Sequence, residues 1–173
     1  MTHFAEPTET EIARAKLPHD IFLSNLIGNH ILVFTAISTF GPTYMKYLFL
    51  VPLISFLALG YTYWRSSRVK REEGEFVWAH WQVARRWSRF FMMILLLLVS
   101  VSTLGVLGHM HLGMMKEAVY AMIGGLGILP TLVSVLVLIV IESDSLHHAR
   151  MGTLPKWALK RFLNIDAESS QDD

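Results

Sequence analysis

Two histidines and three methionines stand close together in the segment GHMHLGMMKE, at positions 108–117. Imidazole nitrogens and thioether sulfurs are soft ligands that suit copper. The side chains are His109, Met110, His111, Met114 and Met115. Their spacing predicts a site for copper or another transition metal in a turn outside the membrane. The alternative is a polar turn whose methionines pack against neighbouring helices.

A second group of polar residues lies inside an apolar run. Asn25 and Asn29 are four residues apart and share a helix face, while His30 lies about 100° further round. His30 could carry a proton, ligate a haem or line a substrate path. The alternative is hydrogen bonding between helices, which satisfies polar groups in lipid. The hydroxyl partners that we expect on the third apolar run are Ser100, Ser102 and Thr103.

A third group follows the fourth apolar run, in the sequence ESDSLHH. It comprises Glu142, Asp144, His147 and His148, and the residues expected on the same side of the membrane are His19, Asp20 and His80. Carboxylates and imidazoles together can bind a metal or pass protons. The alternative is a solvated helix end, where charged residues mark the membrane boundary. The sequence leaves open whether these residues form one site.

A haem with two histidine ligands requires both ligands at one depth. At 1.5 Å per helical residue, His30 lies about 12 Å into its span and His109 about 28 Å into its own. We therefore do not expect these two residues to hold one haem within the chain. A haem shared between His30 and another subunit stays compatible with the sequence.

Four apolar runs must position these groups, and each is long enough to cross a bilayer as a helix. They cover residues 21–40, 47–64, 90–107 and 118–141. Their interiors contain no Asp, Glu, Lys or Arg, and they do not alternate as the strands of a membrane barrel would. We predict an all-α integral membrane protein, a four-helix bundle made of two helical hairpins.

Composition and charge distribution agree with this prediction. Hydrophobic residues make up 53% of the 173 residues and charged residues 17%, so a nucleic-acid binder is not expected. The absence of cysteine excludes thiolate metal sites and disulfide exchange in this chain. All but Lys46 and Lys116 of the 15 Lys and Arg lie in the N-terminal segment, the central connector and the C-terminal segment. This bias predicts that both termini are cytoplasmic.

The chain divides into an N-terminal cytoplasmic segment (1–20), a four-span domain (21–141) and a cytoplasmic tail (142–173). We expect a short helix at 8–15, broken at 17–20, with Asp20 capping the first span. The connector at 65–89 is rich in Trp and Arg and predicts an amphipathic helix in the headgroup layer. Gly124, Gly125, Gly127 and Pro130 predict close packing and a kink in the fourth span.

No complete catalytic motif occurs in the sequence, so we expect no catalytic activity of its own. The sequence favours a non-catalytic subunit or anchor of a larger complex in the inner (plasma) membrane, with the lipid bilayer and other membrane subunits as partners. One alternative is a redox protein that binds copper or haem through the His and Met residues of the turn, with His30 as a candidate cofactor ligand. Another is a small oligomeric transporter.

Overall fold

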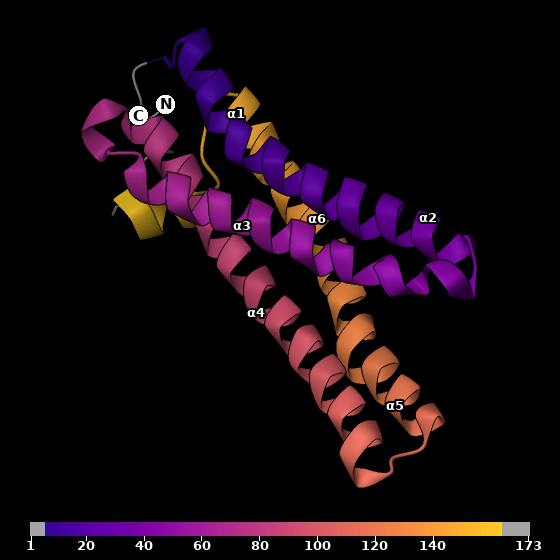
Figure 1. Cartoon of the computed structure of the whole chain (residues 1–173). Coiled ribbons are helices and arrows are strands. Elements are labelled where there is room, and N and C mark those ends of the chain that lie inside the picture. The colour runs from indigo at the N-terminus through magenta and orange to yellow at the C-terminus, as the bar shows by residue number, and fades with distance from the viewer. Residues whose placement is uncertain (1–5, 164–173) are drawn as a thin grey trace.

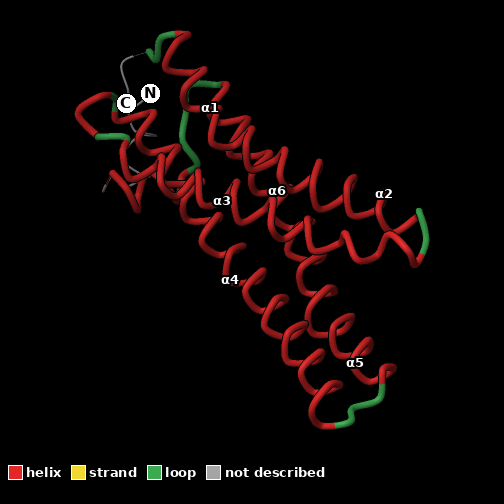
Figure 2. The backbone as a smooth tube through the Cα atoms, viewed as in Figure 1, coloured by secondary structure: helices red, strands yellow, loops and turns green. Residues whose placement is uncertain are grey.

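The computed structural model describes residues 6–163, and the regular structure in this range is entirely helical (Figure 1). Figure 2 shows long helices joined by short loops. Four helical stretches are long and apolar enough to cross a membrane, at Glu9–Thr39, Thr43–Arg68, Glu75–Leu112 and Lys116–Arg150. The prediction of an all-α, multi-pass, four-helix membrane protein is confirmed.

The first hairpin consists of two of these stretches. Its elements are α1 (Glu9–Leu23), the π-helical η1 (Ser24–Val33), α2 (Phe34–Thr39), the 3-10 helix η2 (Pro42–Phe49) and α3 (Leu50–Arg68). The reversal between α2 and η2 uses Gly41, whose φ of 96° is unfavourable for a residue with a side chain. The elements α1, η1 and α2 form one long helix antiparallel to α3.

The second hairpin contains the longest helix and the C-terminal elements. After the short η3 (Arg71–Glu73) come α4 (Glu75–Leu112), α5 (Lys116–Met122), the π-helical η4 (Ile123–Ile128) and α6 (Leu129–Arg150). The short α7 (Lys156–Ala158) and η5 (Leu159–Leu163) follow. Gly113 ends α4 in the left-handed conformation, with φ of 68°. Pro130 lies in the first turn of α6, directly after the π-helical stretch, where a proline is tolerated.

The N-terminal segment differs from its prediction. Helix α1 begins at Glu9 and continues through Pro18 into η1, so no break occurs at residues 17–20 and Asp20 is not a helix cap. Thr8 is the cap: its hydroxyl accepts from the backbone N–H of Glu11, whose carboxylate accepts from the Thr8 N–H. Pro18 removes one backbone hydrogen bond but is buried within the fold, so packing outweighs its helix-breaking tendency.

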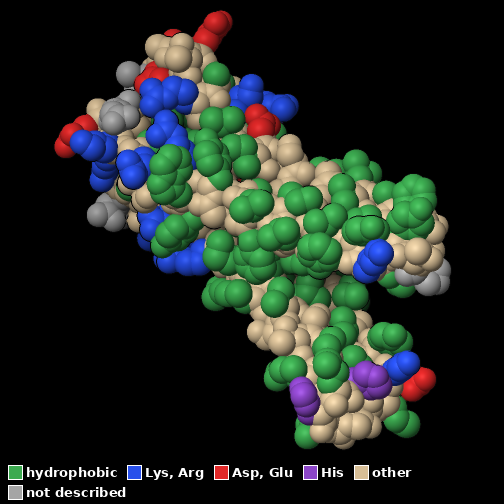
Figure 3. All heavy atoms as spheres, in the orientation of Figure 1, with side chains coloured by type: hydrophobic (Ala, Val, Ile, Leu, Met, Phe, Trp, Pro, Cys, Tyr) green, Lys and Arg blue, Asp and Glu red, His purple; other side chains and the backbone are tan. Residues whose placement is uncertain are grey.

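The two hairpins form a V (Figure 1). They contact one another mainly through α1, η1 and α3 of the first hairpin and α4 and α6 of the second. We call the joined side the charged end, because it carries most of the Lys and Arg residues, as Figure 3 shows. The opposite side, with the 40–41 and 113–115 loops, is the turn end, where the hairpins diverge.

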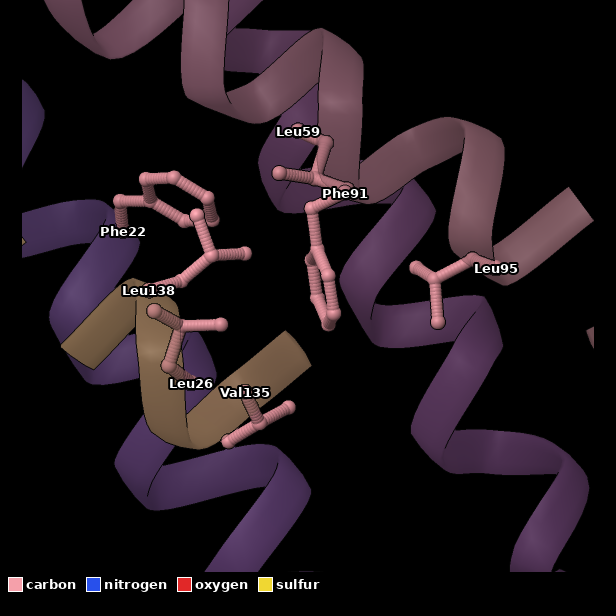
Figure 4. Close-up of a cluster of buried hydrophobic side chains, with 7 residues drawn as sticks. All are labelled: Phe22, Leu26, Leu59, Phe91, Leu95, Val135 and Leu138. Atoms are coloured by element: carbon pink, nitrogen blue, oxygen red, sulfur yellow. The ribbon is translucent and has the colours of Figure 1, made fainter. Parts of the chain in front are cut away.

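The buried core explains why the hairpins join at one end. All four long helices contribute to a cluster of buried side chains (Figure 4), namely Phe22, Leu26, Leu59, Phe91, Leu95, Val135 and Leu138. Two further clusters, around Ala15 and Trp81 and around Val83 and Leu154, lie still closer to the charged end. Large apolar side chains elsewhere on the helices, such as Leu57 and Val140, are exposed and suited to contact lipid.

Candidate functional site

Three long helices bring two histidines and a glutamate together at the charged end. His19 of α1, His80 of α4 and Glu142 of α6 each have no exposed surface. Nδ1 of His19 lies 2.6 Å from Oε2 of Glu142, and Nε2 of His19 lies 3.0 Å from Nδ1 of His80. We call this group the His–His–Glu clamp, because it links the first hairpin to both helices of the second.

The hydrogen bonds of the clamp determine where its protons lie. Nε2 of His80 donates to the carbonyl oxygen of Thr153 at 3.0 Å, because a carbonyl can only accept. Nδ1 of a neutral His80 is then an acceptor, so Nε2 of His19 donates to it. One further proton lies between His19 and Glu142, either on the carboxyl group or on the imidazole. The clamp is therefore a directional chain that holds one shared proton.

One atom of the clamp is left without a partner. Oε1 of Glu142 is buried and has no hydrogen-bond partner within the described part of the chain. The ring nitrogens of His19 and His80 face hydrogen-bond partners and do not converge on an empty point. Consistent with this, residues 6–163 contain no group of three or more His, Asp or Glu side chains arranged to hold a metal ion. The chemistry available to the clamp is hydrogen bonding and proton binding.

The other members of this predicted group lie outside the clamp. Asp20, Asp144 and His147 are exposed. His148 is partly exposed: its Nε2 lies 3.9 Å from a carboxylate oxygen of Asp144, and its Nδ1 lies 2.9 Å from the Thr153 hydroxyl. Of the seven residues that the sequence suggested as one possible site, three are thus buried in the clamp and four lie at its periphery.

A second buried network lies deeper, between the helices of the first hairpin. Nδ2 of Asn25 donates to the Ser55 hydroxyl at 2.8 Å, and Nε2 of His30 lies 3.0 Å from the same oxygen. Nδ2 of Asn29 donates to the carbonyl oxygen of Val51 at 2.7 Å. Hydrogen bonding between helices is therefore the arrangement that these residues adopt.

The partners of this network differ from those expected. Ser102 donates to the Leu98 carbonyl within its own helix, and within residues 6–163 neither Ser100 nor Thr103 is hydrogen-bonded to the network. The partner helix is α3, because the first two spans pair closely as a hairpin. Ser55 was missed by sequence reasoning, although Val51, Ser55, Leu59 and Thr62 recur at helical spacing and are all buried.

An apolar cleft opens between the hairpins at the turn-end side of this network. Its volume is about 390 Å³, and both hairpins line it. The first hairpin contributes His30, Phe34 and Phe49, and the second contributes Leu98, Thr103 and Ile128. His30 is buried at the edge of the cleft, with its ring against Phe91 at a centroid distance of 4.9 Å. In Figure 3 the molecule is hollowed between its two arms.

The residues proposed as a metal site lie at the turn end, at the tip of the second hairpin. Nδ1 of His109 donates to the Met114 carbonyl at 2.7 Å, which leaves its Nε2 as the free ring nitrogen. The Met114 side chain packs over Gly108, so it serves as a packing methionine. Met110 and Met115 are exposed, as is His111. His111 and Met114 line a common pocket at this tip, and the metal site stays a prediction.

The chain matches no protein-family model, no curated protein and no solved structure. The features of the chain from which a function can be inferred are therefore the clamp, the buried network and the cleft.

Proposed function

We propose that this chain is a non-catalytic subunit or anchor of a larger assembly in the inner (plasma) membrane, and that the cleft between its hairpins receives a transmembrane helix of a partner protein. The cleft is the observation that carries the proposal. Its walls come from two hairpins that the clamp and the core hold together at the charged end. The positions of the Lys and Arg residues support a cytoplasmic charged end.

Two hydroxyl groups of the cleft wall are arranged in a way that suits an apolar occupant. Ser102 donates to the Leu98 carbonyl at 2.7 Å, and Thr131 donates to the Gly127 carbonyl at 2.8 Å. Because these hydroxyl groups are satisfied within their own helices, the wall presents mainly carbon to an incoming segment. A helix has no free backbone donors or acceptors along its length, so it can enter without leaving polar groups unpaired.

Small residues near the cleft support a helix as the occupant. A Cβ atom at Gly124 or Gly125 would meet no atom within 4 Å, so the backbone of η4 is open to close approach from outside. By contrast, a Cβ at Gly127 would lie 2.8 Å from the Leu98 side chain, because this glycine already serves the packing of η4 on α4. Small residues at helix surfaces are characteristic of contacts between transmembrane helices.

Photocrosslinking from neighbouring positions tests this proposal. A photoreactive amino acid at Thr103 faces the cleft, whereas the same group at Leu104 lies at the same depth outside it. We expect crosslinking in native membranes to give a protein adduct of defined mass from Thr103 and not from Leu104. Equal adducts from both positions, or lipid adducts alone from Thr103, would contradict the proposal.

Proton binding at the charged end is a second candidate function. It is favoured by the buried Glu142, whose Oε1 has no partner in the described residues and whose Oε2 ends a chain of two histidines. Groups of this kind inside membrane proteins are characteristic of proton relays. Proteoliposomes with a trapped pH indicator test it: proton uptake should exceed that of Glu142→Gln. Equal uptake by both proteins would remove this candidate.

A further inference from the structure

Four arginines meet around one cavity at the charged end. The cavity has a volume of about 210 Å³ and is lined by Gln82, Arg85, Arg86, Arg89, Arg161 and Phe162. The first four belong to α4 and the last two to η5, so segments more than seventy residues apart build it together. We call this cavity the arginine pocket. The sequence placed three of its arginines in the predicted amphipathic connector, but it gave no indication that Arg161 lies beside them.

The positive charge of the arginine pocket is not neutralised by the described residues. Within residues 6–163, no ion pair joins any of its four arginines to a carboxylate. Four guanidinium groups around one small cavity repel one another. An anion in the pocket would relieve that repulsion and accept several charge-assisted hydrogen bonds.

Aromatic side chains hold two of the guanidinium groups in place. Arg85 lies over the Tyr63 ring, 4.4 Å from its centroid. Arg86 lies 4.9 Å from the centroid of Trp157 and 5.4 Å from that of Trp87. These contacts restrict the side chains before any ligand binds, and such stacked arginines are suited to recognise phosphate.

The depth of the arginine pocket identifies its ligand. Arg89 directly precedes Phe90, the first residue of an uncharged stretch that continues to Leu107. The pocket therefore lies where hydrocarbon meets headgroups, and the rings of Trp87 and Trp157 mark the same level, as interfacial aromatics do. We infer that the arginine pocket binds the phosphate of an anionic phospholipid. This inference does not depend on the proposed subunit role.

Phospholipid binding fits the rest of the pocket wall. Phe162 offers an apolar surface beside the arginines, which suits the glycerol and upper acyl region of a lipid. Gln82 offers an amide group that can bind the neutral part of a headgroup such as glycerol. Basic pockets at the cytoplasmic side of membrane helices bind anionic lipids in this way.

The test compares two double variants of the full-length chain. Arg89→Gln with Arg161→Gln removes two charges from the pocket at exposed positions. The matched control is Arg68→Gln with Lys70→Gln, which removes two exposed charges at the same end of the molecule but outside the pocket. Native mass spectrometry measures the binding of phosphatidylglycerol and of phosphatidylcholine to each purified protein.

We expect the wild-type chain to bind one phosphatidylglycerol in preference to phosphatidylcholine. The pocket variant should lose about 30-fold in affinity for phosphatidylglycerol, while the control keeps the wild-type preference. Equal binding of the two lipids by the wild type would overturn the inference, as would equal losses in both variants.

Two further measurements distinguish a bound lipid from other possible occupants of the arginine pocket. Excess inorganic phosphate should not displace phosphatidylglycerol, and displacement would show that the pocket is a site for free anions. The acidic residues at 166–173 are neutralised in a third full-length variant. If only this variant prefers phosphatidylglycerol, the chain's own acidic segment is the occupant and the inference is wrong.

Discussion

Replacing His19 by alanine should destabilise the protein more than the same change at any other histidine of the charged end. His19 is fully buried and is the central member of the clamp. Without the His19 ring, two buried atoms lose their hydrogen-bond partner. They are Oε2 of Glu142, which lies 2.6 Å from Nδ1 of His19, and Nδ1 of His80, which lies 3.0 Å from Nε2 of His19. At about 1–3 kcal/mol for each unsatisfied buried group, the free energy of unfolding should fall by about 2–6 kcal/mol.

His148→Ala is the matched control for this prediction. His148 lies at the same end but is partly exposed, and its ring has one hydrogen bond, to the Thr153 hydroxyl. We expect the free energy of unfolding of this variant to fall by about 1 kcal/mol or less. Both variants are unfolded in mixed micelles with increasing SDS, and helix content is followed by circular dichroism. Losses within about 0.5 kcal/mol of each other, the scale of a surface substitution, would refute the role of the clamp.

Glu142→Gln provides a second measurement if His19→Ala does not fold. The glutamine amide can donate to Nδ1 of His19 and so preserve the direction of the hydrogen-bond chain. We expect this variant to stay within about 1 kcal/mol of the wild type. A glutamine variant as unstable as His19→Ala would show that the carboxylate charge, and not the hydrogen bond, stabilises the contact.

Three more predictions follow from the buried network, the topology and the turn-end histidines. Asn29→Leu should lower the free energy of unfolding in detergent by about 0.6 kcal/mol, because it removes the bond to α3; wild-type stability would contradict this. A cysteine at Thr43 should react with an impermeant reagent added to intact cells and one at Glu72 should not, and the reverse pattern would invert the proposed topology. If His109 and His111 bind copper, their joint replacement by alanine should abolish copper content in elemental analysis without unfolding the protein; equal copper in both proteins would end that hypothesis.

The helices themselves could be predicted from sequence because each apolar run is a local property of the chain. The exception is residues 8–23, where Pro18 suggests a break. Local preference disfavours proline inside a helix, but the burial of Pro18 and the contacts of His19 with the second hairpin outweigh it. That packing depends on α4 and α6, which the local sequence does not contain.

The candidate site could be predicted only in part for the same reason. The sequence offered hydrogen bonding between helices as one of two interpretations of Asn25, Asn29 and His30. Their partner depends on which helix lies beside them, and that helix is α3. It likewise placed His19 and Glu142 on one side of the membrane without a reason to join them. Their contact follows from how α1 crosses α6, which is set by three-dimensional packing and not by the spacing of residues.

Because the hairpins are joined at the charged end, a small rotation there produces a larger displacement at the turn end. From His19 to Thr39 the first arm measures about 30 Å at 1.5 Å per residue. A rotation of about 5° at the clamp therefore moves the tip of that arm by about 3 Å, roughly half a helical turn. A small change in packing around Glu142 would thus be amplified into a larger displacement at the turn end. Conversely, force applied at the tips is concentrated on the few buried contacts that join the arms.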